Sequence, residues 1–251
     1  MQTLKVFNKL PSLVVIGCFL LLAVSTVAQG QGLPSYKVDP FWPKQLPNNW
    51  IIGQVGGMAV DKDDHIWVFQ RPRSNTVDEM SAAQDPPLAQ CCKPAPSVLE
   101  FDKDGNLLKS WGGPGHVPNW PVSEHGIAVD KAGNVWLSGN FQETKDTLGD
   151  REILKFSNDG KLLMTIGHPA KGPDNNQETG YVSRVSSLVV DEDAHELYAA
   201  AGYGNRRVIV FDTETGKFKR GWGAYGNPLS QIDNGPLPPY NPGAPPAKQF
   251  L

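Results

Sequence analysis

A pair of β-hairpins recurs three times along this chain, and this repeat limits the folds that the chain can adopt. The first hairpin of each pair is a short apolar run, a turn that begins with aspartate, and a second β-prone run. The three apolar runs are Gly57–Asp61, Gly126–Asp130 and Ser187–Asp191. Because an aspartate recurs at the same place in each repeat, we interpret these aspartates as turn-forming residues rather than catalytic acids.

The second hairpin of each pair follows after a connection of variable length. These hairpins cover Val98–Trp111, Ile153–Gly167 and Val208–Trp222, and the first two turn at Asp-Gly. Asp-Gly supplies the positive-φ residues of tight hairpin turns. Apolar residues after the N-terminal segment lack a helical period. The sequence therefore predicts an all-β fold, a β-propeller of four-stranded antiparallel blades.

The first residues have the pattern of an export signal. Lys5 and Lys9 precede an almost wholly apolar run, Leu13–Ala28, which ends on small residues. We interpret residues 1–28 as a signal peptide and expect a secreted or periplasmic protein without a stable membrane span. The alternatives are an uncleaved N-terminal membrane anchor, and a lipoprotein attached at Cys18, which is disfavoured because apolar residues continue after that cysteine.

The remainder divides by composition and repeat. Residues 29–49 form an N-terminal segment that we expect to supply a ring-closing outer strand, 50–228 hold the blades, and 229–251 are a Pro/Gly-rich segment between blades. Three visible blades cannot close a ring, which needs at least four. We therefore expect the chain to be truncated after about three to four blades.

Charge and cysteine content indicate which partners and which disulfides to expect. There are 23 basic and 26 acidic residues, a formal charge of −3 and no run of Lys and Arg, which disfavours nucleic-acid binding. Cys91 and Cys92 are adjacent. They either form a vicinal disulfide, pair with other cysteines, or stay as free thiols.

Two of the repeat segments carry a family resemblance. Gly126–Trp136 and Gly204–Phe211 resemble the NHL-repeat family of six-bladed β-propellers. The resemblance implies the fold and leaves the function open, because such propellers serve both binding and catalysis. Our first hypothesis is a ligand- or protein-binding scaffold, and the alternative is an enzyme.

Strand direction locates the candidate site. Residues just before the innermost strand of a blade and just after the next strand surround the same mouth of a propeller channel. Arg71, His125 and Tyr203 hold such positions on three successive blades. A cation, a base and a phenol therefore converge at one mouth, where we expect a small molecule, peptide or protein to bind.

The same positions resemble a known enzyme family. Phe69–Arg71, Glu124–Ile127 and Gly202–Arg206 are similar to segments of peptidyl-α-hydroxyglycine α-amidating lyase, a six-bladed propeller. The resemblance implies that Arg71 and Tyr203 are catalytic, that Arg71 orients a substrate carboxylate and that Tyr203 handles a proton. It also implies that His125 is one of three zinc ligands, with the other two histidines beyond residue 251, and that calcium is a second candidate metal.

Other chemically capable residues have structural interpretations. His65 and His195 fall in turns at the opposite face of the propeller, and we interpret both as turn residues. Ala201 precedes Gly202 where the lyase family usually has aspartate, which is a departure from its pattern. The long connection Pro72–Pro96 leaves the first blade at the predicted mouth, and it is either a binding loop or a disordered insertion.

Overall fold

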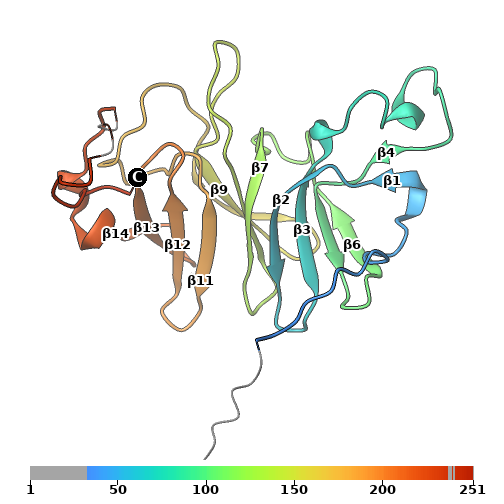
Figure 1. Ribbon diagram of the computed structural model, residues 1–251, viewed down its shortest axis with the longest axis horizontal. Helices are drawn as coiled ribbons and strands as arrows, with labels where there is room; N and C mark the ends of the chain where they lie inside the picture. The colour runs from blue at the N-terminus through green and yellow to red at the C-terminus, as the bar shows by residue number, and fades with distance from the viewer. Residues whose placement is uncertain (1–32, 237–238, 240, 251) are drawn as a thin grey trace, which may run out of the picture. The chain divides into compact units, whose positions relative to one another are not determined.

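The computed structural model describes residues 33–236, 239 and 241–250 (Figure 1). The predicted signal peptide, residues 1–28, lies outside the described residues. The chain divides into two units, residues 1–39 and 40–251, and every described strand belongs to the second. Within the described ranges, no helix is long and apolar enough to cross a membrane.

Three four-stranded antiparallel sheets make up the second unit, as the repeat predicts. The first blade contains β2 (Gln54–Val60), β3 (Ile66–Arg71), β5 (Val98–Phe101) and β6 (Leu107–Trp111). The second contains β7 (Glu124–Val129), β8 (Val135–Gly139), β9 (Glu152–Phe156) and β10 (Leu162–Gly167). The third contains β11 (Ser187–Asp191), β12 (Glu196–Ala201), β13 (Arg207–Asp212) and β14 (Phe218–Trp222).

The described part of the chain has no α-helix and a few short irregular elements. A two-stranded parallel pair joins β1 (Trp50–Ile51) to β4 (Lys93–Pro94). The 3-10 turns are η1 (Pro47–Asn49), η2 (Pro72–Ser74), η3 (Ser81–Ala83), η4 (Ala224–Gly226) and η5 (Leu229–Gln231). The all-β prediction is confirmed.

The aspartate of the first hairpin forms its turn by accepting hydrogen bonds. Asp61 Oδ1 accepts the backbone N–H groups of Asp63 and His65, at 2.9 and 3.0 Å. Its Oδ2 accepts the indole N–H of Trp67 at 2.9 Å. Asp130 repeats this arrangement in the second blade, so the aspartates are scaffold residues, as predicted.

The blades pack through apolar side chains that alternate along each strand. In β8, Val135 and Leu137 face the first blade, whereas Trp136 between them faces the third. All three are fully buried. Successive side chains of β8 therefore point to opposite faces of its sheet, and both faces are buried, as expected for a strand between two neighbouring blades.

The inner strands of neighbouring blades approach one another closely. β7 contacts both β2 and β11. Gly56 in β2 permits this approach, because a Cβ at that position would overlap the backbone carbonyl of Glu124 in β7. The order β2, β7, β11 therefore brings the start of each blade toward a common centre (Figure 1).

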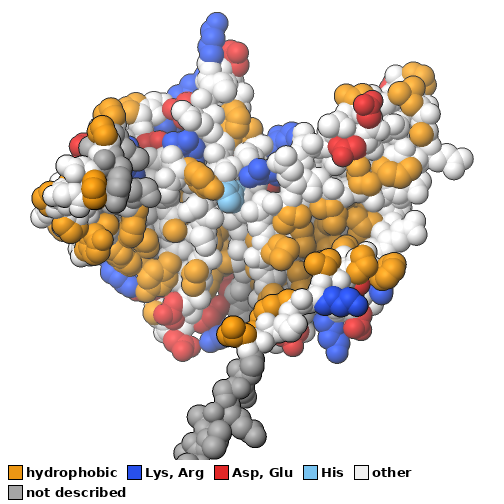
Figure 2. Space-filling model, in the orientation of Figure 1, with side chains coloured by type: hydrophobic (Ala, Val, Ile, Leu, Met, Phe, Trp, Pro, Cys, Tyr) orange, Lys and Arg blue, Asp and Glu red, His pale blue; other side chains and the backbone are white. Residues whose placement is uncertain are grey.

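The outer face of the first blade is covered by the segment before β2. Trp42 packs against Phe101 with ring centroids 5.5 Å apart, and Lys44 N–H donates to Gly105 O at 2.9 Å. Hydrophobic side chains gather over β3 and β6 in Figure 2. Residues 33–49 form no strand, only η1, so the ring-closing outer strand at 29–49 stays a prediction.

The long connection after β3 is anchored to two blades. Gln70 Nε2 donates to Ala95 O at 2.7 Å within the first blade. Arg73 Nη2 donates to Pro121 O and to Val122 O, each at 2.7 Å, beside the second blade. These contacts hold the connection in place, so the interpretation as a disordered insertion is wrong. In the same connection Cys91 and Cys92 form a disulfide with each other, which selects one of the predicted alternatives.

Candidate functional site

The predicted site residues lie at the same end of their blades. Arg71 is the last residue of β3 and is paired with Gln54, the first residue of β2. His125 is the second residue of β7, and Tyr203 comes two residues after β12. The turns between the first two strands of each blade lie at the opposite end, so all three residues are at the same end of their blades. Their catalytic and metal-binding roles stay predictions.

His125 and Tyr203 contact each other directly although they belong to different blades. His125 Nε2 lies 3.1 Å from the hydroxyl of Tyr203. The two ring centroids are 5.3 Å apart, and the ring planes are inclined by 41°. His125 Nδ1 is buried without a hydrogen-bond partner, whereas Tyr203 is 53% exposed. The phenol is therefore oriented by the imidazole and remains open to a ligand.

Arg71 lies next to this pair and has only neutral partners. Its Nε donates to the backbone carbonyl of Glu124, the residue before His125, at 2.7 Å. Its two Nη atoms lie 3.4 Å from the amide oxygens of Gln54 and Asn140. Among the residues that the structure describes, no carboxylate pairs with Arg71. A guanidinium in this state can bind an anionic group of a ligand.

The loop that carries Tyr203 is held by a buried amide. Asn205 is fully buried, and its Oδ1 accepts the N–H of Ser183 at 2.8 Å. Its Nδ2 donates to Asn175 O at 3.1 Å. Because a buried amide with both ends bonded has little freedom, the backbone two residues before it is fixed in position.

Three buried acidic side chains lie at the mouth-side ends of β7 and β9. Glu124 Oε1 accepts the indole N–H of Trp120 and the hydroxyl of Ser97, at 3.0 and 3.1 Å. Asp150 accepts three backbone N–H groups, and burial nevertheless raises its pKa. Burial, together with the nearby charge of Asp150, raises the pKa of Glu152 to about 8. Glu152 therefore holds its proton at neutral pH.

The mouth does not contain a complete zinc site within the described residues. Zinc is bound by three or four protein side chains. Of the described histidines, only His125 is at the mouth, where it contacts Tyr203. His116 is elsewhere and bonds Gly160 O at 2.7 Å. The zinc role of His125 and the calcium implied by the resemblance both stay predictions.

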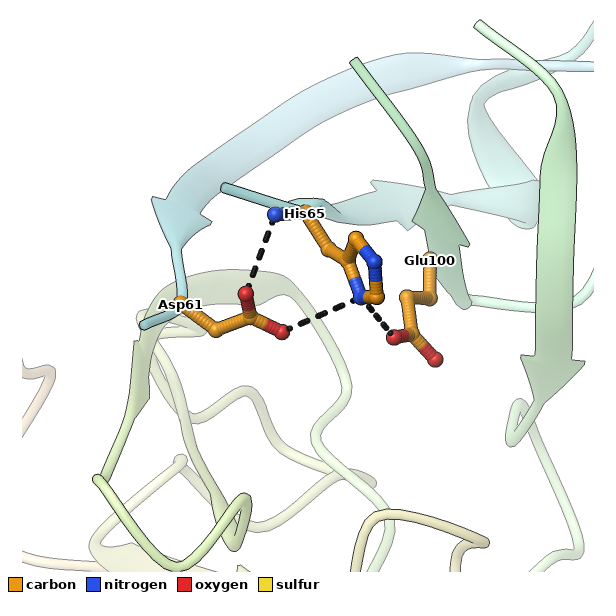
Figure 3. Close-up of side chains that lie close together, drawn as sticks. All are labelled: Asp61, His65 and Glu100. Atoms are coloured by element: carbon orange, nitrogen blue, oxygen red, sulfur yellow. Dashed lines mark hydrogen bonds and ion pairs between the residues drawn. The ribbon is translucent and has the colours of Figure 1, made fainter. Parts of the chain in front are cut away.

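A different cluster brings three metal-ligand atoms together, and the sequence interpretation missed it. His65 Nδ1 lies 2.8 Å from Glu100 Oε1 and 3.5 Å from Asp61 Oδ2 (Figure 3). His65 is in the turn at the far face, as predicted, but it is more than a turn residue. Glu100 was missed because it is one polar residue in an otherwise apolar third strand, which by itself gives no signal of a ligand.

No family model matches this chain. It is 24% identical over 184 residues to peptidyl-glycine alpha-amidating monooxygenase of Mus musculus, covering 71% of this chain and 17% of that protein. It is 24% identical over 196 residues to peptidyl-alpha-hydroxyglycine alpha-amidating lyase 1 of Drosophila melanogaster, covering 75% and 32%.

The chain is similar to amidating lyases. A probable peptidyl-alpha-hydroxyglycine alpha-amidating lyase of Caenorhabditis elegans is 24% identical over 188 residues, which cover 72% of this chain and 45% of that protein. The matches therefore span less than half of each of these relatives. A solved gluconolactonase of Xanthomonas campestris aligns with a TM-score of 0.40 and 13% identity, over 66% of this chain and 47% of that one. The assignment to NHL repeats stays a prediction.

Proposed function

We propose that the mouth formed by Arg71, His125 and Tyr203 is the substrate site of a lyase of the amidating type. The observation that carries this proposal is the His125–Tyr203 hydrogen bond of 3.1 Å beside the guanidinium of Arg71, which has only neutral partners among the described residues. These residues come from three separate blades and from the three segments that resemble the lyase family. The similarity to curated amidating lyases supports the same function.

The substrate would be an N-acyl-α-hydroxyglycine. Arg71 pairs with the substrate carboxylate and so places the adjacent carbinol carbon near Tyr203. The hydroxyl of Tyr203 gives its own proton to the amide nitrogen while its oxygen takes the proton of the substrate hydroxyl, so the phenol is regenerated. The C–O bond becomes a carbonyl as the C–N bond breaks, and the nitrogen takes up a proton. The products are a primary amide and glyoxylate, so atoms and charge balance without an oxidant.

His125 contributes by position. Its Nε2 shares a hydrogen bond with the hydroxyl of Tyr203 and keeps the phenol at the mouth. The family resemblance makes His125 a zinc ligand as well. The described residues supply one imidazole at the mouth, which is fewer than the three or four ligands that zinc needs.

A noncatalytic binding propeller is the second candidate. The free charge of Arg71 favours it equally, since a guanidinium without a carboxylate partner binds an anionic ligand whether or not chemistry follows. The ligand would be a carboxylate-bearing small molecule or peptide at the same mouth. For either function we propose export through residues 1–28 to the periplasm or the exterior.

Glyoxylate release from an N-acyl-α-hydroxyglycine tests the proposal. The chain is assayed with and without added zinc, and so are the variants Tyr203→Phe and Tyr225→Phe. We expect Tyr203→Phe to lower kcat by about 10²–10⁴-fold, the usual contribution of a positioned acid or base. Tyr225, which is 84% exposed and away from the three site residues in sequence, serves as the matched control and should leave kcat unchanged.

Binding separates the two candidates. Arg71→Gln should raise KM for the hydroxyglycine and weaken binding of glyoxylate in a titration. If no preparation releases glyoxylate but Arg71→Gln still abolishes carboxylate binding, the protein is the noncatalytic binding propeller. Absence of both turnover and carboxylate binding would remove the mouth as a functional site.

A further inference from the structure

A polar cavity at the far face of the first blade contains ligand atoms of three types of side chain. Asp61 directly follows β2 and begins the β2–β3 turn, His65 precedes β3, and Glu100 is on β5. Figure 3 shows His65 Nδ1 pointing between the two carboxylates. The three ligand atoms lie within 4.8 Å of one another. The cavity they line has a volume of about 250 Å³.

Glu100 is the least expected member of this cluster. Its side chain is 4% exposed, and its Oε2 has no hydrogen-bond partner. A buried carboxylate oxygen without a hydrogen bond is costly, so it indicates either a cation or an unsatisfied group. Lys109 lies 3.5 Å from this oxygen but donates its hydrogen bond to Asn158, at 2.7 Å.

The repeat provides a comparison within the same chain. In the second blade, Asn134 takes the turn position of His65. Lys155 is paired with Trp136 there, as Glu100 is paired with Trp67. A lysine in place of Glu100 excludes a cation at that site.

The third blade also lacks part of the cluster. It has His195 in its turn, but the residue paired with Tyr198 on its third strand is Val210. Of the three described blades, the first alone has a buried glutamate on its third strand, opposite the turn aspartate and histidine. The buried Glu196 of the third blade is on the second strand and pairs with Lys219 and Arg220. The scaffold role of Asp61 is shared by the second blade and a turn histidine by the third, whereas a glutamate at the position of Glu100 is particular to the first blade.

The charges at the cluster suit a divalent cation. Asp61 and Glu100 supply two carboxylates, and Lys109 forms an ion pair with Glu100, with Nζ 3.5 Å from Oε2. Lys62 pairs instead with Asp63, at 2.6 Å. Four carboxylates and two lysines line the cavity, so acidic groups are in excess there: Asp61, Asp63, Glu100, Asp130, Lys62 and Lys109.

We propose that His65 Nδ1 and the carboxylates of Asp61 and Glu100 bind a first-row divalent transition cation. Imidazole nitrogen favours Zn²⁺ and its neighbours over Ca²⁺ and Mg²⁺, which prefer all-oxygen sites. Three protein ligands leave one position of a tetrahedral ion for water. The site is at the opposite face from Arg71, His125 and Tyr203, and it is independent of the proposed lyase function.

Zinc titration of the metal-free full chain tests the site. The background variant His125→Gln removes the histidine at the mouth, so that the two sites are not confused. We expect one Zn²⁺ to bind per chain, with a change in the NMR signals of the His65 ring, and no saturable binding of Ca²⁺ at the same concentrations. His65→Asn, which copies the second blade, should weaken Zn²⁺ binding by at least 10-fold, and Glu100→Gln should do the same.

His195→Asn is the matched control, because His195 occupies the same turn in the third blade and its side chain is 62% exposed. It should leave zinc affinity unchanged. Thermal unfolding of each metal-free variant establishes whether it folds. If His65→Asn does not fold, zinc binding by Glu100→Gln and the NMR signals of the His65 ring test the site instead. Unchanged zinc binding in both Glu100→Gln and His65→Asn, or no binding in the His125→Gln background, would overturn the proposal and leave an ion-paired histidine.

Discussion

The buried carboxyl of Glu152 should make the stability of this protein depend on pH. Burial and the charge of Asp150 raise the pKa of Glu152 from its ordinary 4.5 to about 8. Because the folded state holds this proton more tightly than the unfolded state, stability is retained in full below pH 4.5. It falls as the pH rises from there toward 8.

The magnitude follows from the two pKa values. One pKa unit corresponds to about 1.4 kcal/mol, so the carboxyl of Glu152 should reduce the free energy of unfolding by about 2 kcal/mol between pH 5 and pH 7. Glu152→Gln keeps an oxygen for the N–H of Arg151, which lies 2.9 Å from Glu152 Oε2, and removes the titration. For a domain of this size the difference is roughly 4–8 °C in Tm.

Thermal unfolding of the wild type and Glu152→Gln across this pH range is the assay. We expect Tm of the variant to exceed that of the wild type by more at pH 7 than at pH 5. Glu214→Gln is the control, because its side chain is 71% exposed. Parallel Tm curves for the wild type and Glu152→Gln from pH 5 to pH 8 would refute the argument that burial holds the proton on this carboxyl.

Two further predictions concern backbone and cysteine chemistry. Gly139→Ala should lower Tm well below that of Gly202→Ala, because the new Cβ at Gly139 would overlap the carboxylate of Asp150, whereas Gly202 has ordinary van der Waals space; equal Tm values would contradict this packing. Cys91 and Cys92 should resist alkylation in the native protein and gain two labels after reduction, as measured by mass spectrometry, and labelling without a reductant would contradict their disulfide.

Much of the fold was predictable because the blades are built from local signals. Asp-Gly turns and apolar runs specify hairpins over a few residues, and the predicted run to Gly167 coincides with the end of β10. Gly105 and Gly160 take the positive φ values of 85° and 89° that their turns require. Strand direction alternates strictly, so the mouth shared by Arg71, His125 and Tyr203 could also be derived from the order of the strands.

Contacts between residues that are distant in sequence were decided by the tertiary structure. The 3.1 Å contact of His125 with Tyr203 depends on how closely the second and third blades pack. The approach of Glu100 to His65 depends on the register between β3 and β5 and on burial of a polar side chain in an apolar strand.

The sequence by itself therefore determined the fold class, the repeat and the end of each blade at which the candidate residues lie. Turn chemistry and strand alternation are short-range properties, so they can be predicted from neighbouring residues. Hydrogen bonds and ligand clusters require distances of about 3 Å between side chains on separate strands. Those distances are set by packing across the whole core, and only the tertiary structure specifies them.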